Sequence, residues 1–140
     1  MPPASRNTIR ATIESRLAAE LALSPAIPVV FNNVSYAPTP NSSWVQCLLS
    51  FGANNYLTLG STTDSDNRIV GVIVVNIFTP AGVGSGANFT IAKRIRDLYN
   101  RVNVSGVYFD APIGPEVVSA SPEGYFQTQV RVTFEFIEEL

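Results

Sequence analysis

The spacing of apolar residues predicts two amphipathic helices. In residues 5–22 an apolar side chain recurs at every fourth position, which places one stripe on one helical face: Ile9, Ile13, Leu17 and Leu21. Residues 88–102 return to the same period with a second stripe, which consists of Ile91, Ile95, Leu98 and Val102. Ser85 or Asn88 is expected to cap the second helix, because both residue types accept hydrogen bonds from free amides at helix starts.

Between and after these helices the pattern changes to that of strands. Strands are predicted over 26–34, 44–52 with a continuation at 54–60, 68–78, 106–110, 116–120 and 125–139. The run 68–78 is almost wholly apolar and β-branched, which is typical of a central strand covered on both faces. The last run alternates strictly, so one face is predicted to carry Phe126, Thr128, Val130, Val132, Phe134 and Phe136.

The order of elements predicts an α+β domain in which two helices pack on one face of a mainly antiparallel, mixed β-sheet. The chain of 140 residues is expected to form a single domain, 1–140, with residues 1–4 flexible. The polar stretch 61–67 reads as the tip of a projecting β-hairpin that spans 54–68. The pairing of the region 106–124 stays open, and one arrangement sets 116–120 beside the last strand.

The composition bears on the nature of the surface, because charged residues are few and unevenly placed. Only 14% of residues are charged, although 46% are hydrophobic, whereas roughly a quarter of an average domain is charged. Self-assembly would explain such a surface, and a β-rich domain with a Ser, Thr and Asn surface is the alternative. The net charge is −2, and the charges are unevenly placed, with +3 over 88–104 and −4 over 116–140. These two segments could face one another between subunits, or each could simply be solvated.

The residue types of this chain give little support to a catalytic or metal-binding site. The chain has no histidine and a single cysteine, Cys47, which excludes an internal disulfide, a cysteine metal cluster and histidine-based nucleophile pairs. Asp64 and Asp66 could bind a cation weakly, but solvated charges at a hairpin tip are the favoured interpretation. No apolar run reaches the ~20 residues of a membrane helix. The sequence predicts no catalytic residues, cofactor or metal, and no membrane association.

The loop 79–88 raises one specific alternative. Its glycines Gly82, Gly84 and Gly86 fit the G-x-G-x-x-A spacing of a pyrophosphate-binding turn. That motif places the first glycine directly at the strand end and an acid about 20 residues later. Here Thr79-Pro80-Ala81 intervenes, Asp110 follows Gly82 only after 28 residues, and no Gly-Lys-Ser/Thr follows. A glycine-rich hinge that faces another polypeptide is favoured, with a small nucleotide-binding enzyme as the less favoured alternative.

The order of several short motifs resembles a known family. The sequence contains "TLG", then "R" and "G" within "DNRIVG", then "F.P.G.G" and the helix "IAKRIRDLY", which correspond to Thr58, Leu59, Gly60, Arg68, Gly71, Phe78, Pro80, Gly82 and Gly84. This order is similar to that of phage tail terminator proteins, also called minor tail or tail completion proteins. The resemblance covers roughly residues 8–137, and the long tract around "APIGPEVVSA" departs from it.

The resemblance implies a structural virion protein at the head–tail junction, assembled in the host cytoplasm. Terminators of this kind form a homo-hexameric ring on the head-proximal end of the tail tube, stop tube polymerisation and offer a docking surface to the head connector or neck proteins. The tail tube protein, with the sheath if the tail contracts, would be a partner. DNA would pass through the bore without sequence-specific binding. A head-closure or neck protein, or another tail structural protein, is the alternative.

Within that expectation, the subunit and tube interface is predicted to use the hairpin, the glycine loop and the two charged segments. The hairpin and loop residues expected there are Tyr56, Leu57, Thr58, Leu59, Asp64, Asp66, Arg68, Gly82, Gly84 and Gly86. The charged residues expected there are Lys93, Arg94, Arg96, Glu135, Glu138 and Glu139.

Overall fold

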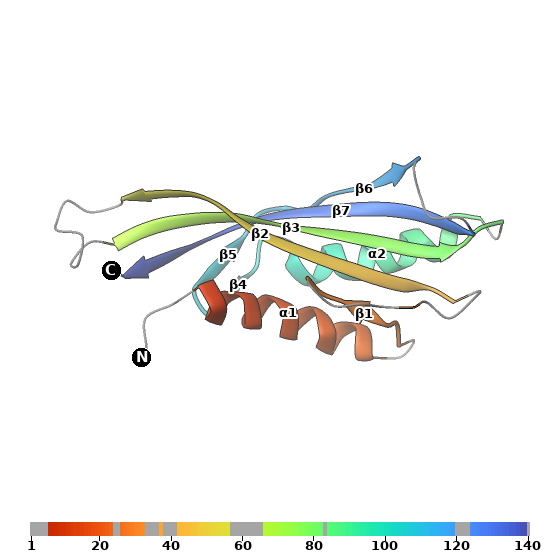
Figure 1. The fold of residues 1–140 in the computed structure, drawn as a ribbon, viewed down its shortest axis with the longest axis horizontal. Helices are drawn as coiled ribbons and strands as arrows, with labels where there is room; N and C mark the ends of the chain where they lie inside the picture. Colours follow the sequence, from red (N-terminus) through yellow and green to blue (C-terminus); the bar gives the residue numbers. More distant parts are fainter. Residues whose placement is uncertain are drawn as a thin grey trace.

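The protein folds as two helices on one side of a long, twisted β-sheet (Figure 1). The computed structural model describes residues 6–23, 26–32, 37, 42–56, 66–82, 84–119 and 124–139. The elements are α1 (Arg6–Ala22), β1 (Val29–Val30), β2 (Trp44–Tyr56), β3 (Asp66–Pro80), α2 (Gly86–Tyr99), β4 (Asn103–Val104), β5 (Val107–Phe109), β6 (Ile113–Val118) and β7 (Tyr125–Glu139). The predicted α+β class is confirmed.

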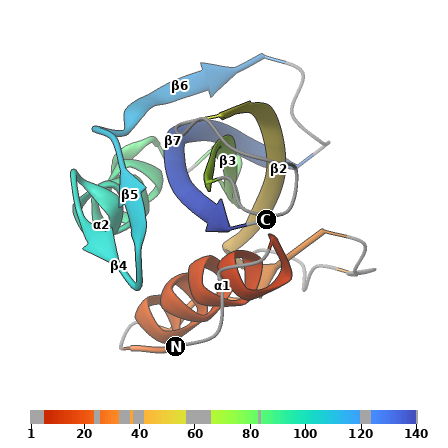
Figure 2. The same ribbon diagram turned by 90° about the vertical axis from the view of Figure 1, so that its left-hand side faces the viewer.

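The sheet is mixed but almost entirely antiparallel. Its strands run in the order β1-β2-β3-β7-β5-β4, and β6 pairs with β7 beside β5. Only β1 and β2 are parallel. The longest pairing joins β3 to β7 without interruption, from Asp66↔Glu139 to Pro80↔Tyr125. Viewed along its long axis (Figure 2), the sheet is strongly twisted, and β6 lies on the side away from α1.

The core lies between the helices and one face of the sheet. The stripe predicted for α1 is confirmed, because Ile9, Ile13, Leu17 and Leu21 are all buried. In α2 the buried face consists of Asn88, Ile91, Ala92, Ile95 and Tyr99. Leu98 and Val102, which the stripe prediction included, are only partly buried. Val102 lies beyond the end of α2 at Tyr99, and Leu98 lines the groove between α2 and α1. The Tyr99 hydroxyl donates to the carbonyl of Ile13 and so reaches the first helix.

The predictions for the strands are partly confirmed and partly wrong. The alternation of β7 is confirmed: Thr128, Val130, Val132, Phe134 and Phe136 are buried on the helix side. The strand predicted over 26–34 is too long within the described residues 26–32, where only Val29–Val30 pairs with β2, and residues 33–34 lie outside the described part of the chain. The run 68–78 is a central strand as predicted, but its second face is only partly covered. Residues 70, 72 and 74 are half-buried, since the helices cover only one face of the sheet.

The three long strands continue past the start of α1 (Figure 1). Arg6, the first residue of α1, lies 6.0 Å from the ring centre of Phe51, so the parts of the strands beyond Phe51 extend past the helix. We call this projection the arm, defined as residues 51–56, 66–71 and 134–139. A β-bulge interrupts the pairing of β2 with β3 between Phe51 and Asn54.

Aromatic rings fill the inside of the arm. Phe51 packs edge to face against Phe134 and Phe136, each with a centroid distance of 6.0 Å. Gly71 makes room for this packing, because a Cβ added there would lie 2.4 Å from the ring of Phe134 and 2.7 Å from the carbonyl oxygen of Ser50. The arm therefore carries its own packed interior although no described helix covers its end.

Candidate functional site

The glycine loop joins β3 to α2 at the end of the molecule opposite the arm. Gly82 and Gly84 have φ angles of 86° and 87°, a conformation that glycine adopts without steric cost. A Cβ added at either position, or at Gly86, would meet nothing within 4 Å. Glycine is therefore explained by backbone conformation at Gly82 and Gly84, whereas no steric constraint within the chain requires it at Gly86.

A shallow hollow of about 330 Å³ adjoins this loop. It is lined by Ala81, Gly82, Gly84, Ser85, Tyr125 and Phe126. None of these side chains carries the positive charge that commonly accompanies phosphate binding. Asp110, the acid considered for a nucleotide ribose, follows β5 and accepts a hydrogen bond from the Thr133 hydroxyl. The lining is that of a contact surface for apolar groups.

The first turn of α2 is held to the sheet by a buried asparagine. Ser85 stands at the N-cap without a side-chain capping bond, and Asn88 is completely buried. The Asn88 amide donates to the carbonyl of Ile77 at 3.1 Å and to that of Phe126 at 3.2 Å. Its oxygen accepts from the Thr128 hydroxyl. Ser85 therefore occupies the predicted cap position, but the expected side-chain capping bond is not formed there, and Asn88 binds the two strands instead of free helix amides.

The three basic residues predicted on α2 have different surroundings. Arg94 donates to the main-chain oxygen of Glu20 at 2.7 Å, and its side chain is only 17% exposed, so it ties α2 to α1. Lys93 forms an exposed ion pair of 2.6 Å with Asp97, one turn along the same helix. Arg96 is exposed. Of these three residues, Lys93 and Arg96 are therefore the ones directed away from the protein body.

Acidic residues gather at the end of the arm. Arg68 and Glu135 form an ion pair between β3 and β7. The backbone register places Asp66 opposite Glu139, with Glu138 beside them. Tyr56 pairs with Asn67 at the same end of β2. The remaining residues predicted for the hairpin lie outside the described part of the chain: Leu57, Thr58, Leu59 and Asp64.

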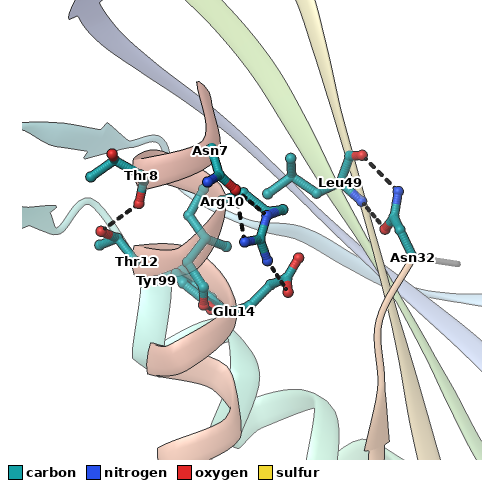
Figure 3. Close-up of polar contacts among 9 residues, drawn as sticks. Asn7, Thr8, Arg10, Thr12, Glu14, Asn32, Leu49 and Tyr99 are labelled. Atoms are coloured by element: carbon teal, nitrogen blue, oxygen red, sulfur yellow. Dashed lines mark hydrogen bonds and ion pairs between the residues drawn. The ribbon is translucent and has the colours of Figure 1, made fainter. Parts of the chain in front are cut away.

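The arm leaves backbone groups of two strands at open sheet edges. On the β2 side, β1 ends early, and the side chain of Asn32 takes its place by bonding both the N–H and the carbonyl of Leu49 (Figure 3). Among the described residues, no strand pairs with 51–56 on that edge or with 136–139 of β7 on the other. Open edges of this kind are templates for pairing with another chain.

The sheet face away from the helices is partly polar and is not covered by a described helix. At its centre the buried amide of Asn76 donates to Gln46 and accepts from Gln127 and Gln129, all at 3.1 Å. Trp44 and Phe78 stack beside this network with a centroid distance of 4.2 Å. Sequence reasoning missed the network, although a lone asparagine in an apolar strand facing alternating glutamines was a signal for it.

Sequence reasoning also missed several exposed apolar side chains. Phe89 on α2 is 42% exposed, Val117 on β6 is 62% exposed, and Ile137 on β7 is 48% exposed. Exposed apolar groups that cluster mark contact sites more often than scattered ones do. Phe89 lies outside the predicted stripe of the second helix, and Ile137 lies on the face of β7 opposite Phe136, so their positions off the buried faces were a signal in the sequence.

The thiol of Cys47 and the ring of Tyr99 are withdrawn from solvent. Burial, with a smaller contribution from Glu14, raises the pKa of the Cys47 thiol to about 12. Burial also raises the pKa of the Tyr99 hydroxyl, which donates to the Ile13 carbonyl. Within the described ranges, no group of three or more His, Cys, Asp or Glu could hold a metal ion, and no helix is long and apolar enough to cross a membrane.

Comparison with known proteins agrees with these features. No curated protein matches the chain. One solved structure, whose title states no function, is similar over 94% of this chain and 95% of its own, with a TM-score of 0.71 and 19% identity. At that identity the likeness shows a shared fold alone. The sequence model of the phage tail terminator protein family matches residues 8–105. That match spans more than half of the chain, which therefore belongs to the family of phage tail terminator proteins.

Proposed function

We propose that this phage tail protein forms a closed homo-hexameric ring on the head-proximal end of the tail tube. There it stops tube polymerisation and presents a docking surface to the head connector. The observation that carries the proposal is the arm: three paired strands that project past α1 and end with open edges. In a member of a structural tail family, such edges provide contacts to neighbouring copies and to the tube.

The distribution of charge supports a ring rather than a symmetric dimer. Residues 1–30 and 86–104, which include both helices, carry seven basic and three acidic residues, whereas the rest of the chain carries two basic and eight acidic residues. A ring uses two different surfaces of each subunit, one for each neighbour. A dimer with twofold symmetry would instead place the same surface on both sides of the contact.

The same distribution suits passage of DNA through the ring. With the sheet face toward the bore, the acidic part of the chain would face the DNA, and like charge would prevent tight binding of the phosphate backbone. The exposed basic residues of α2 would then lie away from the bore. We therefore infer no sequence-specific nucleic-acid recognition.

Electron microscopy of phage particles that lack this chain tests the proposal. Tails longer than those of wild-type particles, without attached heads, are expected if the chain stops tube growth. Tails of normal length without heads would refute the terminator role and indicate a head-closure or neck role instead. Light scattering of the purified protein measures the mass of the assembly and is expected to give that of a ring. A protein that stays strictly monomeric at high concentration, both alone and with tail tube added, would refute ring formation.

The nucleotide-binding alternative has its own measurement. Calorimetric titration with NAD, ATP and GTP is expected to show no binding, because the hollow at the glycine loop offers no cationic side chain. Micromolar binding that is lost in Gly84→Val would overturn the structural assignment. In that case the loop would be a phosphate site rather than a hinge.

A further inference from the structure

The side of α2 that faces away from α1 combines apolar and basic side chains. Phe89, Lys93 and Arg96 follow one another at spacings of four and three residues, so they share one stripe of the helix. All three are exposed, with Phe89 at 42%. The stripe is distinct from the buried face and from the side where Arg94 reaches Glu20 of α1.

Strand β6 adds an exposed apolar residue near the start of α2. β6 contacts α2, and Val117 of β6 is paired in register with Thr128 of β7. Thr128 in turn bonds Asn88, which immediately precedes Phe89. Val117 is 62% exposed. We call Phe89, Lys93, Arg96 and Val117 the α2 flank. It has the composition of a small docking site: an aromatic and an aliphatic group beside two cations.

The arm carries the complementary composition. Ile137 is 48% exposed on β7, and it is adjacent in sequence to Glu138, which Glu139 follows. Asp66 and Glu135 lie on the same end of the sheet. Within a subunit, the arm extends past α1 and away from α2 (Figure 1), so the end of the arm is separated from the α2 flank of its own subunit.

We propose that the arm of one copy docks on the α2 flank of the next copy, a contact that depends on the ring proposed above. The exposed Ile137 would pack against Phe89 and Val117, and the acidic end of the arm, which includes Glu138 and Glu139 in its sequence, would lie beside Lys93 and Arg96. Each subunit uses its arm once and its α2 flank once, so the contact is head-to-tail and closes when the rotation between copies closes.

The other basic surface of the helices suits this partner less well. The groove between α1 and α2 is lined by Ser15, Arg16, Ala19, Glu20, Leu23 and Leu98. Of these lining residues Arg16 is the cation, it already donates to the Leu98 carbonyl, and the groove also holds the acid Glu20. The flank carries two exposed cations, of which Lys93 also pairs with Asp97 at the helix surface, and charge complementarity with the arm therefore favours the flank.

A charge-exchange experiment tests the contact. One variant carries Lys93→Glu and Arg96→Glu, and a second carries Glu138→Lys and Glu139→Lys. Each variant alone places like charges at every junction, which costs several kcal/mol, so the concentration for half-assembly is expected to rise about 100-fold. An equimolar mixture pairs opposite charges at every junction and is expected to regain the wild-type mass in light scattering.

Matched controls separate this contact from general charge effects. Arg101→Glu reverses one positive charge at an exposed position after the end of α2, half of the charge change in the flank variant, and Leu23→Asp changes an exposed apolar residue just after the end of α1. Both are expected to assemble like the wild type, whereas Phe89→Asp is expected to assemble poorly. Circular dichroism checks that every variant is folded before its mass is measured.

Each outcome of this experiment either supports or overturns the proposed contact. If the wild type assembles but either charge-reversed variant also assembles normally, or their mixture stays monomeric, the proposed contact is overturned and the ring stands. Loss of assembly in Arg101→Glu equal to that in the flank variant would overturn it as well. A wild-type chain that stays monomeric at high concentration, with and without tail tube, overturns the ring and the contact together.

Discussion

Asn88 offers the sharpest test of how the glycine loop and α2 are held in place. Its side chain is fully buried and bonds the Ile77 carbonyl, the Thr79 hydroxyl and the Phe126 carbonyl as donor, and the Thr128 hydroxyl as acceptor. Substitution Asn88→Ala removes all of these bonds at once. The partners cannot turn to bulk water, because Thr79 and Thr128 are also fully buried.

The expected loss of stability follows from the cost of leaving buried polar groups unsatisfied. One such group costs about 1–3 kcal/mol, and the truncated side chain also leaves a small cavity. We expect Asn88→Ala to lower the free energy of unfolding by about 3 kcal/mol, a large part of the 5–15 kcal/mol typical of a domain. In urea, with a slope of about 2 kcal/mol per molar, the midpoint would fall by about 1.5 M.

Urea unfolding followed by circular dichroism measures this shift. All proteins are compared at one concentration, because assembly stabilises the folded state by mass action. The matched control is Asn100→Ala, an exposed asparagine that follows α2, with an expected change below about 0.5 kcal/mol. The double variant Asn88→Ala with Thr128→Val is expected to cost less than the sum of its parts, since both remove one shared bond.

Two results would refute this reasoning. If Asn88→Ala unfolds within about 0.5 kcal/mol of the wild type, the buried hydrogen bonds do not hold the first turn of α2. If instead the effects of Asn88→Ala and Thr128→Val add fully, the two side chains act independently and the bond between them contributes nothing measurable.

Three further predictions concern the rest of the fold. Gly71→Ala should lower the free energy of unfolding by about 1–3 kcal/mol, measured by thermal unfolding, because its Cβ would lie 2.4 Å from the ring of Phe134. Cys47 should resist a thiol reagent at pH 8 until the chain unfolds, because burial raises the pKa of its thiol from 9.0 to about 12. The stability that the protonated, buried thiol contributes should be present below pH 9 and be lost as the pH rises from 9 toward 12. Arg94→Ala should cost about 1–2 kcal/mol in urea unfolding, since its guanidinium joins α2 to α1, whereas Arg96→Ala should leave stability unchanged within about 0.5 kcal/mol.

The sequence by itself determined the elements whose signal is local. The helical stripe of α1 and the strict alternation of β7 were readable because side-chain periodicity depends only on backbone geometry. The lack of histidine removed most catalytic chemistry, and the order of short motifs indicated the family that the match over residues 8–105 then showed. The prediction for β7 was reliable because its alternation extends over the whole of Tyr125–Glu139.

Only the tertiary structure decided what each face and each charge contacts. Periodicity shows which residues share a face but not whether a second layer covers it, so the partly open face of β3 could not be recognised from an apolar run. For the same reason Lys93, Arg94 and Arg96 look alike in sequence, yet Arg94 is bound within the chain. Asn88 resembles a helix cap until the strands that it bonds are brought beside it by folding. These assignments depend on contacts between segments distant in sequence, which local patterns do not encode.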